Sequence, residues 1–236
     1  MIPRRTMFDV NAIDVQRVAI FLVPMFLGII LHEVAHGYAA FRFGDPTAKM
    51  LGRLTLNPLK HIDPTGLIVF VITALFMPFA IGWAKPVPVN ARYFKHPVRD
   101  MAITSFAGPC TNFLIAIGFA LLMLLAIKVP ALGALVQGQP LLWSVLEAGV
   151  WINVLLGLFN LMPIPPMDGS HILYSILPRN LGNAYMSIGR YGMLIIILLL
   201  ATGLFWKVLG PLLVRGVTLL IDVFSLPPLW QWTLFN

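Results

Sequence analysis

Charged residues are scarce in this chain. Only 11% of its 236 residues are Asp, Glu, Lys or Arg, and 59% are hydrophobic, whereas soluble domains carry about 25% charged residues. A chain so poor in charge cannot cover a water-facing surface, which excludes an ordinary soluble protein. The composition therefore predicts an all-α polytopic membrane protein, because a run of about 20 apolar residues crosses a bilayer as a helix.

Cysteine and acidic residues are also few. The single cysteine, Cys110, excludes an intrachain disulfide and a metal site built from several cysteines. Nine acidic residues stand against sixteen basic ones, which gives a net charge of +7. Most basic residues lie in loops beside apolar runs, where they meet lipid headgroups. We therefore expect the basic residues to contact the lipid bilayer, and we expect no nucleic acid as a partner.

Long apolar runs are the candidate membrane spans, at residues 15–41, 101–127, 141–162, 185–205 and 207–226. Segment 64–90 is ambiguous, because its apolar part is barely long enough to cross and Pro78 interrupts it. Its end, residues 82–90, has an extended pattern whose prolines restrict it to a sheet edge. We expect five to six transmembrane helices, with a re-entrant or edge-strand segment between the first two core helices.

A metal-binding motif lies inside the first apolar run. His32 and His36 are four residues apart, which on a helix places both imidazoles on one face, one turn apart. They can bind one zinc ion, while Glu33 lies about 100° around the helix and reaches a metal-bound water as the general base. Each polar side chain in a membrane span costs a few kcal/mol, so a chance match is a poor explanation.

Asp168 is the candidate third ligand, because catalytic zinc has three protein ligands and one open position. It follows an apolar span and three prolines within residues 160–169. Such irregular backbone is tolerated at membrane depth only when it is buried in protein or lines a wet cavity. An interfacial turn capped by an aspartate is the alternative. His171 and His61 are rival ligands, and the sequence leaves the role of Glu147 open.

These motifs resemble those of the site-2 protease family of intramembrane zinc metalloproteases, peptidase family M50, in its compact form without a PDZ domain. The matching segments are the zinc motif at 32–36, a helix motif at 106–112 and a second signature at 160–169. The resemblance implies one membrane-embedded metalloprotease domain over 1–236. Its catalytic core lies at about 15–180, and additional helices follow at about 185–226.

The resemblance also implies roles for particular residues. His32, His36 and Asp168 bind one Zn²⁺ ion, Glu33 is catalytic, and Asn160 and Asn112 contact substrate or stabilise the oxyanion. The activity implied is hydrolysis of peptide bonds in or near the transmembrane segments of membrane-protein substrates, which is regulated intramembrane proteolysis. No feature of the sequence fixes the oligomeric state.

Two further expectations come from the residues themselves. Val87 and Val89 lie in a segment that can pair with the backbone of an unwound substrate, although a simple connecting loop is an equal alternative. The competing function is a membrane transporter or metal-binding membrane protein without protease activity. That alternative gives no reason for Glu33 to stand between the two histidines.

The order of the spans predicts a topology. His32 lies nearer the end of its span that leads into loop 42–63, so Asp168 must emerge on that side. With 101–127 and 141–162 both crossing, this requires 64–90 to return to its starting side. The same arrangement gives that side the larger excess of Lys and Arg, which marks it as cytoplasmic. We expect a cell-membrane protein whose active site opens toward the cytoplasm.

Overall fold

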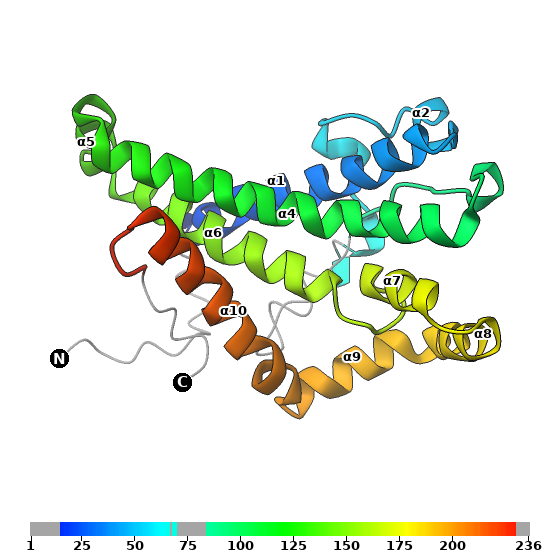
Figure 1. The fold of residues 1–236 in the computed structure, drawn as a ribbon. Helices are drawn as coiled ribbons and strands as arrows, with labels where there is room; N and C mark the ends of the chain where they lie inside the picture. The colour runs from blue at the N-terminus through cyan, green and yellow to red at the C-terminus, as the bar shows by residue number, and fades with distance from the viewer. Residues whose placement is uncertain (1–14, 67, 70–83, 230–236) are drawn as a thin grey trace.

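Three long helices form the centre of the molecule (Figure 1). In the computed structural model, which describes residues 15–66, 68–69 and 84–229, these are α1 (Val15–Arg42), α4 (Pro97–Lys128) and α6 (Pro140–Asn160), and each packs against the other two. Proline begins α4 and α6, where its missing N–H is not needed. Apolar side chains of α4, α6 and α10 (Leu204–Phe224) form the main buried cluster, which includes Phe119, Met123, Val150, Val154 and Val217.

Shorter elements surround this centre at both ends. The helices α2 (Thr47–Met50), α7 (Asp168–Ile176) and α8 (Arg179–Ser187) lie at one end of α4, and α5 (Pro130–Gln137) lies at the other (Figure 1). α9 (Gly192–Ala201) leads into α10, and Gly203 between them has a left-handed φ of +71°. Three 3₁₀ turns complete the described elements, at Pro58–Lys60, Ala91–Tyr93 and Ile188–Tyr191.

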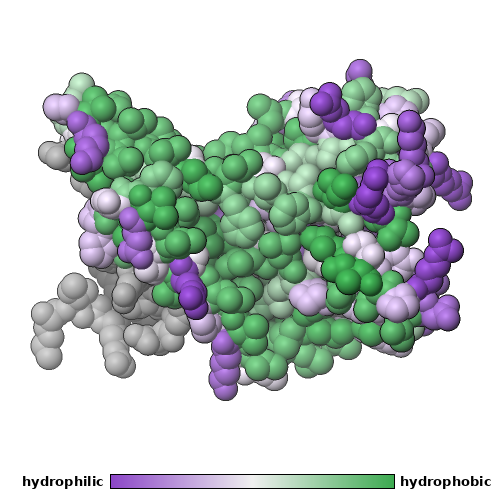
Figure 2. Space-filling model, in the orientation of Figure 1, coloured by the Kyte–Doolittle hydropathy of each residue, from purple (hydrophilic) through white to green (hydrophobic). Residues whose placement is uncertain are grey.

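Five described stretches are long and apolar enough to cross a membrane, namely Ile20–Arg42, Pro97–Lys128, Leu141–Asn160, Arg179–Ala201 and Leu204–Phe224. They confirm the all-helical, multi-pass membrane class. The fourth is not one straight helix, because α8, a 3₁₀ turn and α9 succeed one another within it. Figure 2 shows a broad hydrophobic face across the middle of the molecule, with hydrophilic side chains gathered toward its ends.

The connection between α1 and α4 is described only at its two ends, and Pro78 lies outside the described residues. Ile62 and Ala84 form an isolated antiparallel bridge, and the N–H of Lys85 donates to the carbonyl of His61 at 2.8 Å. The two described ends of the connection therefore lie side by side. Within the described part this bridge is the only β pairing, so residues 84–90 do not form the expected regular edge strand. Prolines 86 and 88 remove two of the donors that a strand needs.

Candidate metal centre

His32, His36 and Asp168 meet at one point in the described structure. The Nε2 atoms of the two histidines are 2.9 Å apart. Oδ2 of Asp168 lies 3.1 Å from Nε2 of His32 and 3.2 Å from Nε2 of His36. Both histidines are buried and Asp168 is partly buried. Two imidazoles and one carboxylate, converging on a common centre, are a donor set typical of catalytic zinc. The separate motifs of the sequence thus come together as one cluster.

Several observations show that the cluster fits a metal ion. Oδ2 of Asp168 is buried and has no hydrogen-bond donor beside it in the described structure apart from the Nε2 atoms of the two imidazoles. Gly108 of α4 faces the same point. A Cβ at this position would collide with Nε2 of His36 and lie 2.6 Å from Cε1 of each histidine. The site is therefore kept clear of side-chain atoms on the α4 side.

The backs of the two imidazoles are held by α4. Nδ1 of His36 lies 2.7 Å from the carbonyl of Thr104, and Nδ1 of His32 lies 2.7 Å from Oδ1 of Asn112. A carbonyl only accepts a hydrogen bond, so Nδ1 of His36 is the protonated nitrogen and Nε2 keeps its lone pair. Outer partners of this kind fix the orientation of metal-binding histidines. Thr104 acts through its backbone carbonyl, so its residue type does not indicate this role in the sequence.

The loop that carries Asp168 needs two close backbone contacts. Asp168 begins α7, which packs against α4. A Cβ on Gly169 would collide with the carbonyl of Leu161, and one on Gly192 would collide with the carbonyl of Pro165. Glycine at these two positions therefore allows the proline-containing loop to place Asp168 against the histidines. The contact with Gly192 depends on how α9 packs, which the sequence alone does not show.

The carboxyl group of Asp168 is electrostatically suited to a cationic ligand. Burial by itself raises its pKa, but the hydrogen bonds and positive charges that His32 and His36 supply when they are protonated outweigh burial. The result is a pKa lowered from 3.8 to about 2. Asp168 is therefore an anion throughout the neutral pH range, as a metal ligand must be.

Glu33 points toward the connecting segment instead of the helices. Its Oε2 accepts a hydrogen bond of 2.6 Å from the N–H of Val87. The segment is fixed on both sides of Val87, because Nη2 of the buried Arg53 donates to the carbonyl of Lys85 at 2.6 Å and the N–H of Asn90 donates to Oδ2 of the buried Asp45 at 2.6 Å. Arg53 and Asp45 were not among the residues that the sequence predicted for the site.

The remaining predicted site residues lie elsewhere. Asn112 is fully buried on the Nδ1 side of His32, opposite the metal cluster. The amide of Asn160 donates to the carbonyl of Leu156 in its own helix at 3.0 Å. Val89 is partly buried beside Val87 in segment 84–90.

The rival polar residues are outside the cluster of three ligands. His61 lies 2.8 Å from the carbonyl of Thr55 within its own loop. Glu147 accepts a hydrogen bond of 2.9 Å from the indole of Trp143 in its own helix. His171 lies on α7, one turn after Asp168. Burial lowers the pKa of His171, against the attraction of Asp168.

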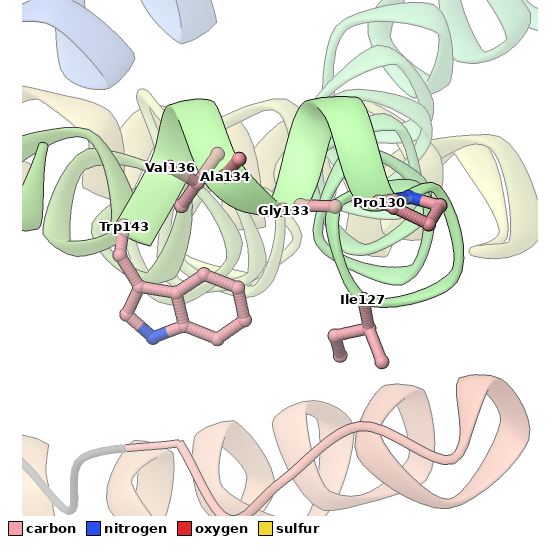
Figure 3. Close-up of a pocket in the computed structure, with 7 residues that line it drawn as sticks. Ile127, Pro130, Gly133, Ala134, Val136 and Trp143 are labelled. Carbon is pink, nitrogen blue, oxygen red and sulfur yellow. The ribbon is translucent and has the colours of Figure 1, made fainter. Parts of the chain in front are cut away.

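A separate cavity of about 560 Å³ lies at the opposite end of α4 (Figure 3). Its lining comes from the end of α4, from α5 and from the start of α6, and consists of Ala126, Ile127, Pro130, Gly133, Ala134, Val136 and Trp143. None of these side chains is a metal ligand or a general base. The cavity therefore plays no part in the candidate metal centre.

Known proteins are similar to this sequence over most of its length. The profile of peptidase family M50 matches residues 20–200. The chain is 38% identical over 208 residues to the "Putative zinc metalloprotease YwhC" of Bacillus subtilis (strain 168), with 86% of this chain and 90% of that protein covered. It is 32% identical over 182 residues to the "Putative zinc metalloprotease Rip2" of Mycolicibacterium smegmatis, with 75% and 64% covered. It is 27% identical over 164 residues to the "Zinc metalloprotease MJ0392" of Methanocaldococcus jannaschii, with 70% and 36% covered. No solved structure matches the chain.

Proposed function

This chain belongs to peptidase family M50, the site-2 protease family of intramembrane zinc metalloproteases, and we propose that it hydrolyses peptide bonds in or near the transmembrane segments of membrane-protein substrates. One observation carries the proposal. Two members of the donor set of His32, His36 and Asp168 share a helical turn with Glu33, within a protein that has five candidate membrane spans. Residues 1–236 act as a single membrane-embedded domain with its catalytic core at about 15–180.

His32, His36 and Asp168 hold one zinc ion in this proposal. When bound, zinc supplies Lewis-acid chemistry that activates water and polarises a carbonyl oxygen. Glu33 takes the proton of the attacking water. Its Oε2 stays on the N–H of Val87, which leaves Oε1 to accept that proton. The water oxygen bonds to the peptide carbon, the C–N bond breaks, and Glu33 passes the proton to the leaving amine.

Segment 84–90 has two roles in the proposal. Val87 orients the base, because its only backbone donor is directed at Glu33. Val89 is the candidate partner for an unwound substrate, since its backbone makes no hydrogen bond in the described part of the chain. Asn160, at the end of α6, remains the candidate for orienting substrate or stabilising the oxyanion.

We propose that segment 64–90 is re-entrant, returning to the side of the membrane on which it starts, and that the active site opens toward the cytoplasm. The bridge between Ile62 and Ala84 supports this arrangement, because a full crossing separates its two ends by the thickness of the bilayer. Labelling of Lys60→Cys and Arg92→Cys, in a chain with Cys110 replaced, tests it. Both positions are expected to react from the cytoplasmic side, and reaction from opposite sides would contradict the topology.

The activity is tested by cleavage of a model transmembrane substrate by the full chain and by Glu33→Gln. The wild-type protein is expected to cleave, and Glu33→Gln is expected to keep its zinc and lose about 10²–10⁴-fold in turnover, the usual contribution of a general base. Full activity of Glu33→Gln would refute the assigned base. Zinc-loaded wild-type protein that moves ions across vesicle membranes and never cleaves would favour the transporter alternative.

A further inference from the structure

A chain of buried amides leads from His32 into the centre of the three core helices. Asn112 of α4 and Asn153 of α6 are both 0% exposed. Oδ1 of Asn112 faces Nδ1 of His32 at 2.7 Å, and Nδ2 of Asn112 donates to Oδ1 of Asn153 at 3.3 Å. Two fully buried amides are costly at membrane depth unless they are hydrogen-bonded, and here they bond to each other.

The orientation of these two side-chain amides is fixed by the backbone carbonyls next to Asn153. Nδ2 of Asn153 donates to the carbonyl of Gly149 at 2.9 Å and to that of Pro24 at 3.4 Å. Carbonyls only accept, so the oxygen of Asn153 must face Asn112. Nδ2 of Asn112 in turn faces that oxygen and the carbonyl of Gly28, which is 3.2 Å away.

The orientation of the amides determines which ring nitrogen of His32 carries the proton. Because both acceptors near Asn112 lie on its nitrogen side, its oxygen must face His32. Nδ1 of His32 is therefore the protonated nitrogen, and the lone pair is on Nε2, which faces Asp168. This is the tautomer that a zinc ligand at Nε2 requires.

The close approach of the three helices depends on a glycine. A Cβ at Gly28 of α1 would collide with Oδ1 of Asn153 and lie 3.3 Å from Nδ2 of Asn112. Both amides therefore reach α1 only because residue 28 has no side chain. The sequence around Gly28 gives no sign of this contact, since it joins residues from three distant parts of the chain.

We propose that Asn153 is a positioning residue of the metal site, acting through Asn112 to hold His32 in the zinc-binding tautomer. The hydrogen-bond partners of Asn153 are Asn112, Pro24 and Gly149, and none of them is one of the three ligands. The proposal rests on the assigned role of His32 as a ligand. It differs from a simple packing role, in which buried amides join helices without any effect on the metal.

Zinc affinity tests the proposal without relying on activity. The full chain, purified in detergent, is titrated with zinc against a chromophoric chelator. Asn153→Leu, which keeps the branched shape and removes the hydrogen bonds, is expected to weaken zinc binding by about 10–100-fold, the usual effect of losing an outer partner. Val150→Ala is the matched control, because Val150 is buried in the apolar cluster of the same helix. It is expected to bind zinc as the wild type does.

A double-mutant cycle separates positioning from packing. If Asn153 acts through Asn112, Asn153→Leu has no further effect on zinc affinity in an Asn112→Leu background. Additive losses, or wild-type affinity for Asn153→Leu, would overturn the proposal. If Asn153→Leu does not fold, Asn153→Ser takes its place, because a hydroxyl on a shorter side chain does not reach Asn112 and the same loss is expected.

A third variant distinguishes this inference from the proposed function. His32→Ala is expected to lose zinc binding. Wild-type zinc affinity for His32→Ala would remove the proposed metal site itself. Loss of binding in His32→Ala together with wild-type affinity in Asn153→Leu would remove only the inference about Asn153.

Discussion

Two neighbouring residues of α1 are held by different parts of the molecule. His32 is fixed from behind by a fully buried side chain of a core helix, Asn112. Glu33 is fixed by a backbone N–H from segment 84–90, which connects α1 to α4. The proposed ligands are therefore held by packed helices, whereas the proposed base is oriented by irregular backbone.

This difference assigns separate tasks to the two regions. Packed helices hold ligand atoms rigidly, and a metal site needs fixed ligand positions. Connecting segments are the usual place for groups that contact substrate. Changes behind His32 should therefore alter zinc affinity, and changes that loosen segment 84–90 should alter turnover while zinc stays bound.

The largest effect on the ligand side is expected from Gly108→Ala. The added methyl group occupies space beside both imidazoles, so we expect zinc affinity to fall by about 100-fold or more, beyond the usual effect of an outer partner. Equilibrium titration with zinc measures it. Gly118→Ala in the same helix is the control, because nothing lies within 4 Å of its added Cβ. Unchanged zinc affinity in Gly108→Ala would show that the ligands meet elsewhere.

The corresponding change on the side of the base is Arg53→Met. It removes the donor that holds the carbonyls of Lys85 and Pro86, so Val87 no longer fixes Glu33 accurately. We expect turnover of a model substrate to fall roughly 10–100-fold, as small misplacements of catalytic groups do, with zinc affinity unchanged. Arg92→Met, at an exposed position just beyond the segment, should be neutral. Loss of zinc in Arg53→Met would erase the distinction between the two regions.

A smaller effect concerns acid. A pKa of about 2 keeps the carboxylate of Asp168 charged at pH 4, so acidification from pH 7 to pH 4 does not protonate it. We therefore expect the three ligands to take up no more than two protons when zinc is released over that range, because Asp168 takes up none. The slope of the logarithm of zinc affinity against pH measures this number. A slope approaching three would mean that Asp168 also takes up a proton there.

The sequence supports the most specific predictions where the chemistry is local. His32, Glu33 and His36 share one helical turn, so their spacing alone predicted a ligand pair and a base. Asp168 was predictable from the prolines that end the preceding helix, although its distance to the histidines was not. The spans were also predictable, because apolar runs of this length have few alternatives in a bilayer.

The sequence was insufficient where a role depends on packing between distant segments. Asn153 lies in an apolar span with no motif around it, and its contact with Asn112 exists only because α4 and α6 pack together. Asn112 was found through its motif and given a role toward substrate, whereas the structure places it behind His32. Arg53 looked like one of several basic residues in a loop, and only its buried contact with segment 84–90 sets it apart.

The separation of the two regions is tested most directly by measuring zinc affinity and substrate cleavage on the same preparations of Asn153→Leu and Arg53→Met. Asn153→Leu is predicted to bind zinc about 10–100-fold more weakly and to recover turnover at saturating zinc. Arg53→Met is predicted to bind zinc normally and to remain slow at saturating zinc. Equal losses of zinc affinity in both variants would contradict the account.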